Sequence, residues 1–211
     1  MHRSSQHAQP VGNEELFRAA SLKTEEGVGG QLVLALEHAY EEIRQLHSGG
    51  IEVKEYKNKP GVLGRIPETV IIIGSSSSKY GHFAHSKWTH RMHGGTLAEI
   101  MIGAEGLKRS PREVLGTLLH EAVHGVCHDA GVQDVSGKGK FHNKAFKRTA
   151  EELGLAVQPP HKVHGHSNTE LPEGELQHLV DSITPKLVAY REHDRTVMQA
   201  GAPRVRELSL R

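Results

Sequence analysis

Two histidines with a glutamate beside the first are the residues of this chain that can do chemistry together. The stretch His120-Glu121-Ala122-Val123-His124 places the two imidazoles four positions apart. On a helix, residues i and i+4 point to the same side, so both rings can bind one metal ion. Glu121 is then placed to take a proton from a water on that metal. The pattern predicts a zinc site with Glu121 as the general base.

This short pattern needs support from its surroundings, because the chain contains 17 histidines. Ser110, Pro111 and Glu113 form a helix start signal, with an N-cap, a proline at the first helical position and the carboxylate of a capping box. An apolar stripe follows at helical spacing, and Gly131 is a stop signal. Two histidines and a glutamate inside a buried helix are costly without partners or a metal. Surface histidines, or hydrogen-bonded histidines of the core, are the weaker interpretation.

A catalytic zinc site needs a third protein ligand and keeps its fourth position for water. The pattern favours His142, which opens a second helical repeat with Phe146, so that its ring would point toward the first helix. His128 lies on the same helix face as the first pair, but one turn further along the axis, too far to complete a tetrahedron. The other downstream candidates are His161, His164 and His166.

The residues around this site resemble the SprT-like zinc metallopeptidases, in the compact form found in actinobacteria and their phages. The resemblance spans roughly residues 30 to 170 and rests on two stretches joined by a glycine-rich loop. These stretches are Thr117-Leu118-Leu119-His120-Glu121-Ala122-Val123-His124 and Lys140-Phe141-His142-Asn143-Lys144-Ala145-Phe146.

The resemblance implies that His120, His124 and His142 bind Zn²⁺ and that Glu121 is the general base. It also implies an α+β fold with a zincin-like core, in which a small mixed or antiparallel sheet packs on helices and one helix carries the HExxH pattern. Many relatives end in a cysteine-rich zinc ribbon. This chain has one cysteine, so it cannot form such a ribbon or any DNA contact that the ribbon provides.

The expected activity is zinc-dependent hydrolysis of peptide bonds by a water that Glu121 activates. An extended substrate would add to a sheet edge, and strand 97–102, just before the active helix, is the candidate edge. An ordinary sheet strand fits the same pattern. Two other functions stay open. One is a non-catalytic, zinc-stabilised binding or assembly module, with His128 or a later histidine as fourth ligand. The other is a DNA-associated protease that acts on nucleoprotein.

Composition bears on the expected binding partners and on the cellular compartment. A protein or peptide is the expected substrate, and the formal net charge of +1 gives no overall electrostatic support for nucleic acid as a further partner. The sequence shows no apolar run typical of a signal peptide or a membrane span. The single cysteine, Cys127, fits a reducing compartment and a small buried side chain. These features favour the cytoplasm, and the resemblance implies that of a bacterial or phage-infected cell.

Three parts are expected along the chain: a weakly ordered lead-in over residues 1–28, a metallopeptidase domain over 29–170, and a helical extension over 171–211. Within them, the periodicity and the turn signals predict three more helices and four strands. The helices are expected at 32–46, 172–183 and 184–200, and the strands at 51–56, 69–73, 80–93 and 97–102.

Two further sets of side chains could contribute to a metal site: the histidines of segment 80–93 and two carboxylates. The segment 80–93 contains four histidines, but their spacing repeats no known ligand frame, which argues against a second metal site. These are His82, His85, His90 and His93. Glu105 and Glu151 are candidate carboxylates for orienting the ligand histidines through their second ring nitrogens.

Overall fold

The computed structural model describes residues 27–53, 61–76 and 78–192, and it has the mixed α+β composition that the sequence predicts. None of the helices in these ranges is long and apolar enough to cross a membrane. The helices and 3₁₀ turns are α2 (Val28–Leu46), η1 (Ala104–Lys108), α3 (Pro111–Asp129), α4 (Lys144–Glu152), α5 (Gln177–Ile183) and η2 (Thr184–Lys186). The strands are β1 (Ile51–Val53), β2 (Val62–Gly64), β3 (Thr69–Gly74), β4 (Gly81–Thr89), β5 (Thr96–Gly103), β6 (Val135–Ser136), β7 (Phe141–His142), β8 (Ala156–Val157) and β9 (Thr169–Glu170).

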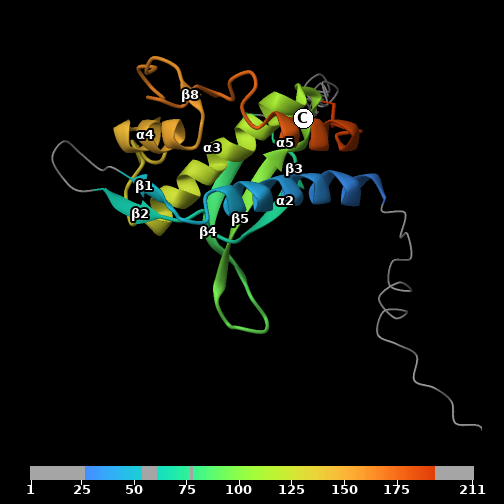
Figure 1. The fold of residues 1–211 in the computed structure, drawn as a ribbon, viewed down its shortest axis with the longest axis horizontal. Helices are drawn as coiled ribbons and strands as arrows, with labels where there is room; N and C mark the ends of the chain where they lie inside the picture. Colours follow the sequence, from blue (N-terminus) through green and yellow to red (C-terminus); the bar gives the residue numbers. More distant parts are fainter. Residues whose placement is uncertain (1–26, 54–60, 77, 193–211) are drawn as a thin grey trace, which may run out of the picture.

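The main sheet has three strands in the order β3-β5-β4. β5 is the central strand: it pairs in parallel with β3 and antiparallel with β4, where His82 lies opposite Met101. The β4–β5 hairpin extends well away from the helices (Figure 1). Strand 97–102 is therefore the ordinary sheet strand of the two predicted alternatives and not a substrate-binding edge, because its backbone is bonded on both sides. The edge strand beside α3 is β4, where Gly81 lies against Thr117 and Glu121.

Helix α3 is the centre of the hydrophobic core. It begins as the sequence predicts: the Ser110 hydroxyl accepts a hydrogen bond from the Glu113 N–H, and the Glu113 carboxylate accepts one from the Ser110 N–H at 2.9 Å. Leucines on several sides of α3 are fully buried, among them Leu115, Leu118 and Leu119. A helix that is apolar nearly all round must be covered all round. Here the cover comes from α2, α4, α5 and the sheet, and α2 crosses in front of the sheet (Figure 1).

The carboxyl-terminal part is less helical than expected. α5 confirms a helix within 172–183, and its Leu179 and Ile183 belong to the same buried cluster as α3. After η2 the chain leaves the helical path, because Leu187 packs against the core and the Arg191 N–H donates to the Ala104 carbonyl at 3.1 Å. The predicted helix over 184–200 is therefore wrong as far as residue 192. Residues 193–200, the lead-in over 1–26 and the predicted strand residues 54–56 lie outside the described ranges.

Candidate metal centre

Helix α3 carries the first two candidate ligands on one side. His120 and His124 are half-buried, and their ring centroids are 5.3 Å apart. Glu121, between them in sequence, is buried, with 5% of its surface exposed. The helix therefore presents two imidazoles and one carboxylate at a place that water reaches only in part, as the sequence predicts.

His142 reaches the same place from a strand rather than from a helix. It lies in β7, and α4 begins only after the next residue, Asn143, whose side-chain oxygen caps the helix by accepting from the Ala145 and Phe146 N–H groups. Two backbone bonds hold β7 in place: the His142 N–H donates to the His164 carbonyl, and the His142 carbonyl accepts from the His166 N–H, both at 3.0 Å. The prediction that the second helix begins at His142 is wrong: α4 begins two residues later, at Lys144.

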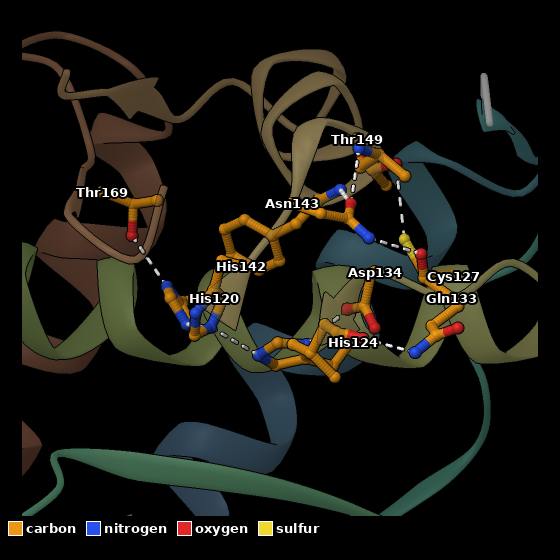
Figure 2. Close-up of polar contacts among 12 residues, drawn as sticks. His120, His124, Cys127, Gln133, Asp134, His142, Asn143, Thr149 and Thr169 are labelled. Carbon is orange, nitrogen blue, oxygen red and sulfur yellow. Dashed lines mark hydrogen bonds and ion pairs between the residues drawn. The ribbon is translucent and has the colours of Figure 1, made fainter. Parts of the chain in front are cut away.

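The three imidazoles converge on one point (Figure 2). Nε2 of His142 lies 3.2 Å from Nε2 of His120 and 3.3 Å from Nε2 of His124. A tetrahedral zinc with Zn–N distances near 2.05 Å separates its nitrogen ligands by about 3.3 Å. Three ring nitrogens at this spacing also cannot all be hydrogen-bonded to one another. Each hydrogen bond needs one donor and one acceptor, and among three nitrogens at least two have the same role. In the described part of the chain, no other group of three histidines, cysteines or carboxylates is arranged to hold a metal ion.

Hydrogen bonds at the second ring nitrogen, Nδ1, orient two of the three rings. The Nδ1 of His124 is 2.5 Å from the carboxylate of Asp134, and the Nδ1 of His120 is 2.9 Å from the hydroxyl of Thr169 (Figure 2). Each contact occupies Nδ1 and leaves Nε2 facing the shared point, which is how metal-binding histidines are usually held. The Nδ1 of His142 is buried and has no hydrogen-bond partner in the described residues.

Neither carboxylate proposed from the sequence for this orienting role takes part. Glu105 instead accepts hydrogen bonds from the Ser76 N–H at 2.9 Å and the Ser75 hydroxyl at 3.0 Å, which ties η1 to the turn after β3. Glu151 forms an ion pair with Lys147 at 3.6 Å on the surface of α4. Asp134 and Thr169 carry no local sequence signal, because both lie in short strands or loops that only the folded chain brings to α3.

Phe146 forms the apolar wall of the site. Its ring centroid is 4.5 Å from that of His142, 4.8 Å from that of His120 and 5.0 Å from that of His124. Phe146 is fully buried, and Ala150 and Leu153, which follow it at helical spacing, are buried as well. An aromatic ring against all three imidazoles keeps water from one side of them and restricts their rotation.

Burial sets the protonation of two of the ligands. Desolvation lowers the pKa of His142 to about 4 and holds the pKa of His120 well below its usual value, and the neighbouring histidines add to both shifts. Burial also lowers the pKa of His124, but the hydrogen bond to Asp134 and the Glu121 and Asp134 charges outweigh it and raise the pKa overall. Neutral imidazoles are the form that binds a metal ion.

Glu121 lies beside the edge strand β4 and has a raised pKa. Desolvation raises its pKa to about 7, against the lowering effects of His124, of the Phe83 backbone N–H that donates to it, and of the Lys79 charge. A Cβ at Gly81 would lie 3.0 Å from the Glu121 carboxylate, so glycine at this position of β4 leaves the space that the carboxylate occupies. The site thus combines a three-nitrogen cradle with a carboxylate able to gain and lose a proton near pH 7.

The other histidines do not join the centre. His128 is exposed and stacks on His85, with ring centroids 4.4 Å apart. His161 and His164 are exposed and stack on each other at 5.2 Å, while the backbone of their segment holds β7. His82, His90 and His93 belong to no group of three candidate metal ligands in the described residues. Cys127 is buried, as expected.

The three histidines therefore lie close enough to bind one metal ion. Comparison of the chain with protein-family models, with curated proteins and with solved structures finds no match.

Proposed function

We propose that this chain is a zinc-dependent peptidase in which Glu121 activates the attacking water. The observation that carries the proposal is the spacing of 3.2 and 3.3 Å between the Nε2 atoms of His142 and those of His120 and His124. Three imidazoles with no fourth protein ligand in the described residues suit catalytic zinc, whereas structural sites usually have four. Membership of the SprT-like family and a zincin-like core are part of the same proposal, and they rest on the sequence resemblance.

Each residue of the site has its own role in the proposed reaction. When bound, zinc lowers the pKa of its water to about 7 and polarises the scissile carbonyl. Glu121 accepts the proton of the attacking water and returns it to the leaving amine, for which a pKa near 7 is suited. Asp134 and Thr169 keep the histidine rings oriented through Nδ1.

The substrate would bind along β4. This strand is an edge of the sheet, and its first residues lie against Glu121. An extended peptide can add to such an edge by main-chain hydrogen bonds, which hold it without regard to most of its side chains. The register of β4 shifts between Ala84 and Trp88, and Ser86 has φ +51°, so regular pairing would be limited to the part of β4 nearest α3.

The alternative of a non-catalytic zinc module needs a fourth ligand. His128 and His161 do not supply it, because each stacks on another exposed histidine outside the centre. The buried Glu121 also has no use in a closed structural site. A nucleoprotein protease shares the chemistry proposed here and differs in requiring DNA, so the same experiment separates the three functions.

The experiment measures zinc content and casein cleavage for the wild type, Glu121→Gln and His142→Ala, with and without single-stranded DNA. We expect one zinc per wild-type chain, retention of zinc in Glu121→Gln with at least a roughly hundredfold loss of kcat/KM, and loss of zinc in His142→Ala. His128→Ala is the matched control and should keep both properties.

Cleavage by Glu121→Gln at the wild-type rate would contradict the mechanism. Zinc binding without cleavage under any condition would favour the binding module, and cleavage only with DNA would favour the nucleoprotein protease.

A further inference from the structure

Strand β3 leaves the second edge of the main sheet without a backbone partner. It pairs only with β5, and within the described residues no backbone hydrogen bond reaches its other side. Residues 70–73 read Val-Ile-Ile-Ile, and all but Ile71 are half-buried. β3 contains no lysine, proline or bulge, three of the devices that commonly protect an edge. Such an edge can accept an extended segment as a further strand.

An acidic cavity of about 260 Å³ adjoins this edge, between β3 and the side of α2. Three carboxylates line it, those of Glu37, Glu41 and Glu68. Arg44 is the one arginine or lysine in the lining, and it is already engaged, since it pairs with Glu41 and donates to the Ile66 carbonyl at 3.3 Å. Glu37 and Glu68 have no hydrogen-bond or ion-pair partner in the part of the chain that the structure describes. The cavity is therefore suited to a positively charged group.

The edge and the cavity are parts of one surface. Thr69 and Ile71, two residues apart on β3, both line the cavity, so they point to the α2 side of the sheet. The side chains of an added strand would alternate in the same way, about 4.8 Å outside β3. Every second side chain would then enter the space beside α2, where a lysine or arginine would meet Glu37 and Glu68.

We propose that β3 and this acidic cavity form a docking site for an extended segment of a partner protein that carries a lysine or arginine. Backbone bonds to β3 supply the general affinity, and the basic side chain supplies selectivity. The segment is not the peptidase substrate, because Glu121 contacts β4 at the opposite edge, with β5 between. The docking site therefore does not depend on the proposed hydrolysis and needs no metal.

The test uses the full chain and two fluorescein-labelled hexapeptides of alternating sequence, one of valine and lysine and one of valine and glutamate. We expect the lysine peptide to bind and the glutamate peptide not to bind, as measured by fluorescence polarisation. The double variant Glu37→Lys and Glu68→Lys should weaken binding by at least about tenfold, because like charges then face each other. Glu42→Lys, which reverses an exposed charge of α2 outside the cavity, is the matched control and should leave binding unchanged.

A second measurement locates the peptide. In hydrogen–deuterium exchange, the lysine peptide should protect the amides of β3 and leave those of β4 unchanged, whereas attraction of the peptide to surface charge alone would protect neither strand. Absence of binding up to millimolar peptide, equal binding of both peptides, or full binding by the double variant would each overturn the proposal.

Two other occupants give distinct outcomes. Residues 193–211 include Arg195, Arg204, Arg206 and Arg211, so a chain that ends at Glu192 must be compared with the full chain. Peptide binding that appears only in the shortened chain would assign the site to this segment instead of a partner. A concentration-dependent dimer that the double variant dissociates would assign it to a second copy.

Discussion

Two groups of histidines in this protein have similar composition and opposite arrangements. His120, His124 and His142 bring three Nε2 atoms to one point, whereas the histidines of segment 80–93 form no such group in the described residues. The first group is held by α3 and β7 inside the core, with Phe146 against every ring. The second lies along β4 and the turn that follows it: His85 stacks on His128 of α3, and the far end of the hairpin extends away from the helices (Figure 1).

The difference shows what makes histidines into a site. In the hairpin, His90 and His93 stack on each other at 4.4 Å, and nothing in the described residues orients a ring nitrogen toward a third ligand. In the centre, Asp134 and Thr169 each occupy one Nδ1 and so aim Nε2. Burial and the orienting contacts, rather than the number of histidines, distinguish the two groups.

The largest effect should come from removing a ligand of the centre. His120→Ala should weaken zinc binding by more than about a hundredfold, because loss of a ligand exceeds the effect of losing an orienting residue. His90→Ala with His93→Ala removes two histidines of the hairpin and should leave one zinc per chain. Chelator competition followed by metal analysis measures both. Loss of zinc from the hairpin variant would show that the two groups share the metal.

The sequence contains local signals for one half of this centre. The Ser110, Pro111 and Glu113 signal and the apolar repeat depend on neighbouring residues, so the helix α3 and the shared face of His120 and His124 could be predicted before the fold was known. Gly154, with φ +84°, directly follows the C-cap of α4, a position that favours glycine.

The other half depends on contacts between distant segments. His142 sits on a strand because its backbone bonds to the segment around residues 164–166, which no local pattern indicates. Thr169 is 49 residues from the ring that it orients. The identity of the edge strand depends on strand order, because β5 has the pattern of a strand whether it lies at an edge or in the centre. These features follow from tertiary packing and could not be predicted from spacing.

The next effect should come from Asp134, which orients His124 by a charged contact. Asp134→Asn keeps a hydrogen-bonding side chain but removes the charge, and it should weaken zinc binding by roughly 10- to 100-fold. Without that charge the pKa of His124 should fall, because Asp134 is a main cause of its rise. Titration of the imidazole by NMR in the zinc-free protein, beside zinc competition, measures both. Asp181→Asn, an exposed change on α5, is the control.

A pH effect of intermediate size should appear in the zinc-free protein. The pKa values of His120 and His142 are lowered from 6.5, so between about pH 6.5 and 5 the unfolded chain takes up protons at both rings while the folded chain does not. The free energy of unfolding must then fall as the pH falls. His124, with a raised pKa, opposes a small part of this fall, because the folded chain binds a proton there at a higher pH than the unfolded chain does.

Glu121 acts in the opposite direction. Its folded pKa of about 7 exceeds the ordinary 4.5, so the folded state gains a proton there as the pH falls, which offsets part of the loss. Glu121→Gln removes this offset. We expect zinc-free Glu121→Gln to lose on the order of 3 to 4 kcal/mol between pH 7 and 5, and the wild type to lose less. Urea unfolding at several pH values measures this, and a steeper loss in the wild type would contradict the assignment of these protons.

The smallest effect should come from Thr169, because its contact with His120 is between neutral groups. Thr169→Val has nearly the same shape and should keep β9 paired with β8, so the change removes the hydroxyl that holds Nδ1 at 2.9 Å. Neutral hydrogen bonds are roughly half as strong as charged ones, so we expect at most about a tenfold loss of zinc affinity, less than for Asp134→Asn. Thr89→Val, on the exposed hairpin, is the control. If Thr169→Val and Asp134→Asn weaken zinc equally, then the contact at Nδ1 matters and its charge does not. The orienting contact at Nδ1, with or without charge, would then be the feature that separates the centre from the hairpin.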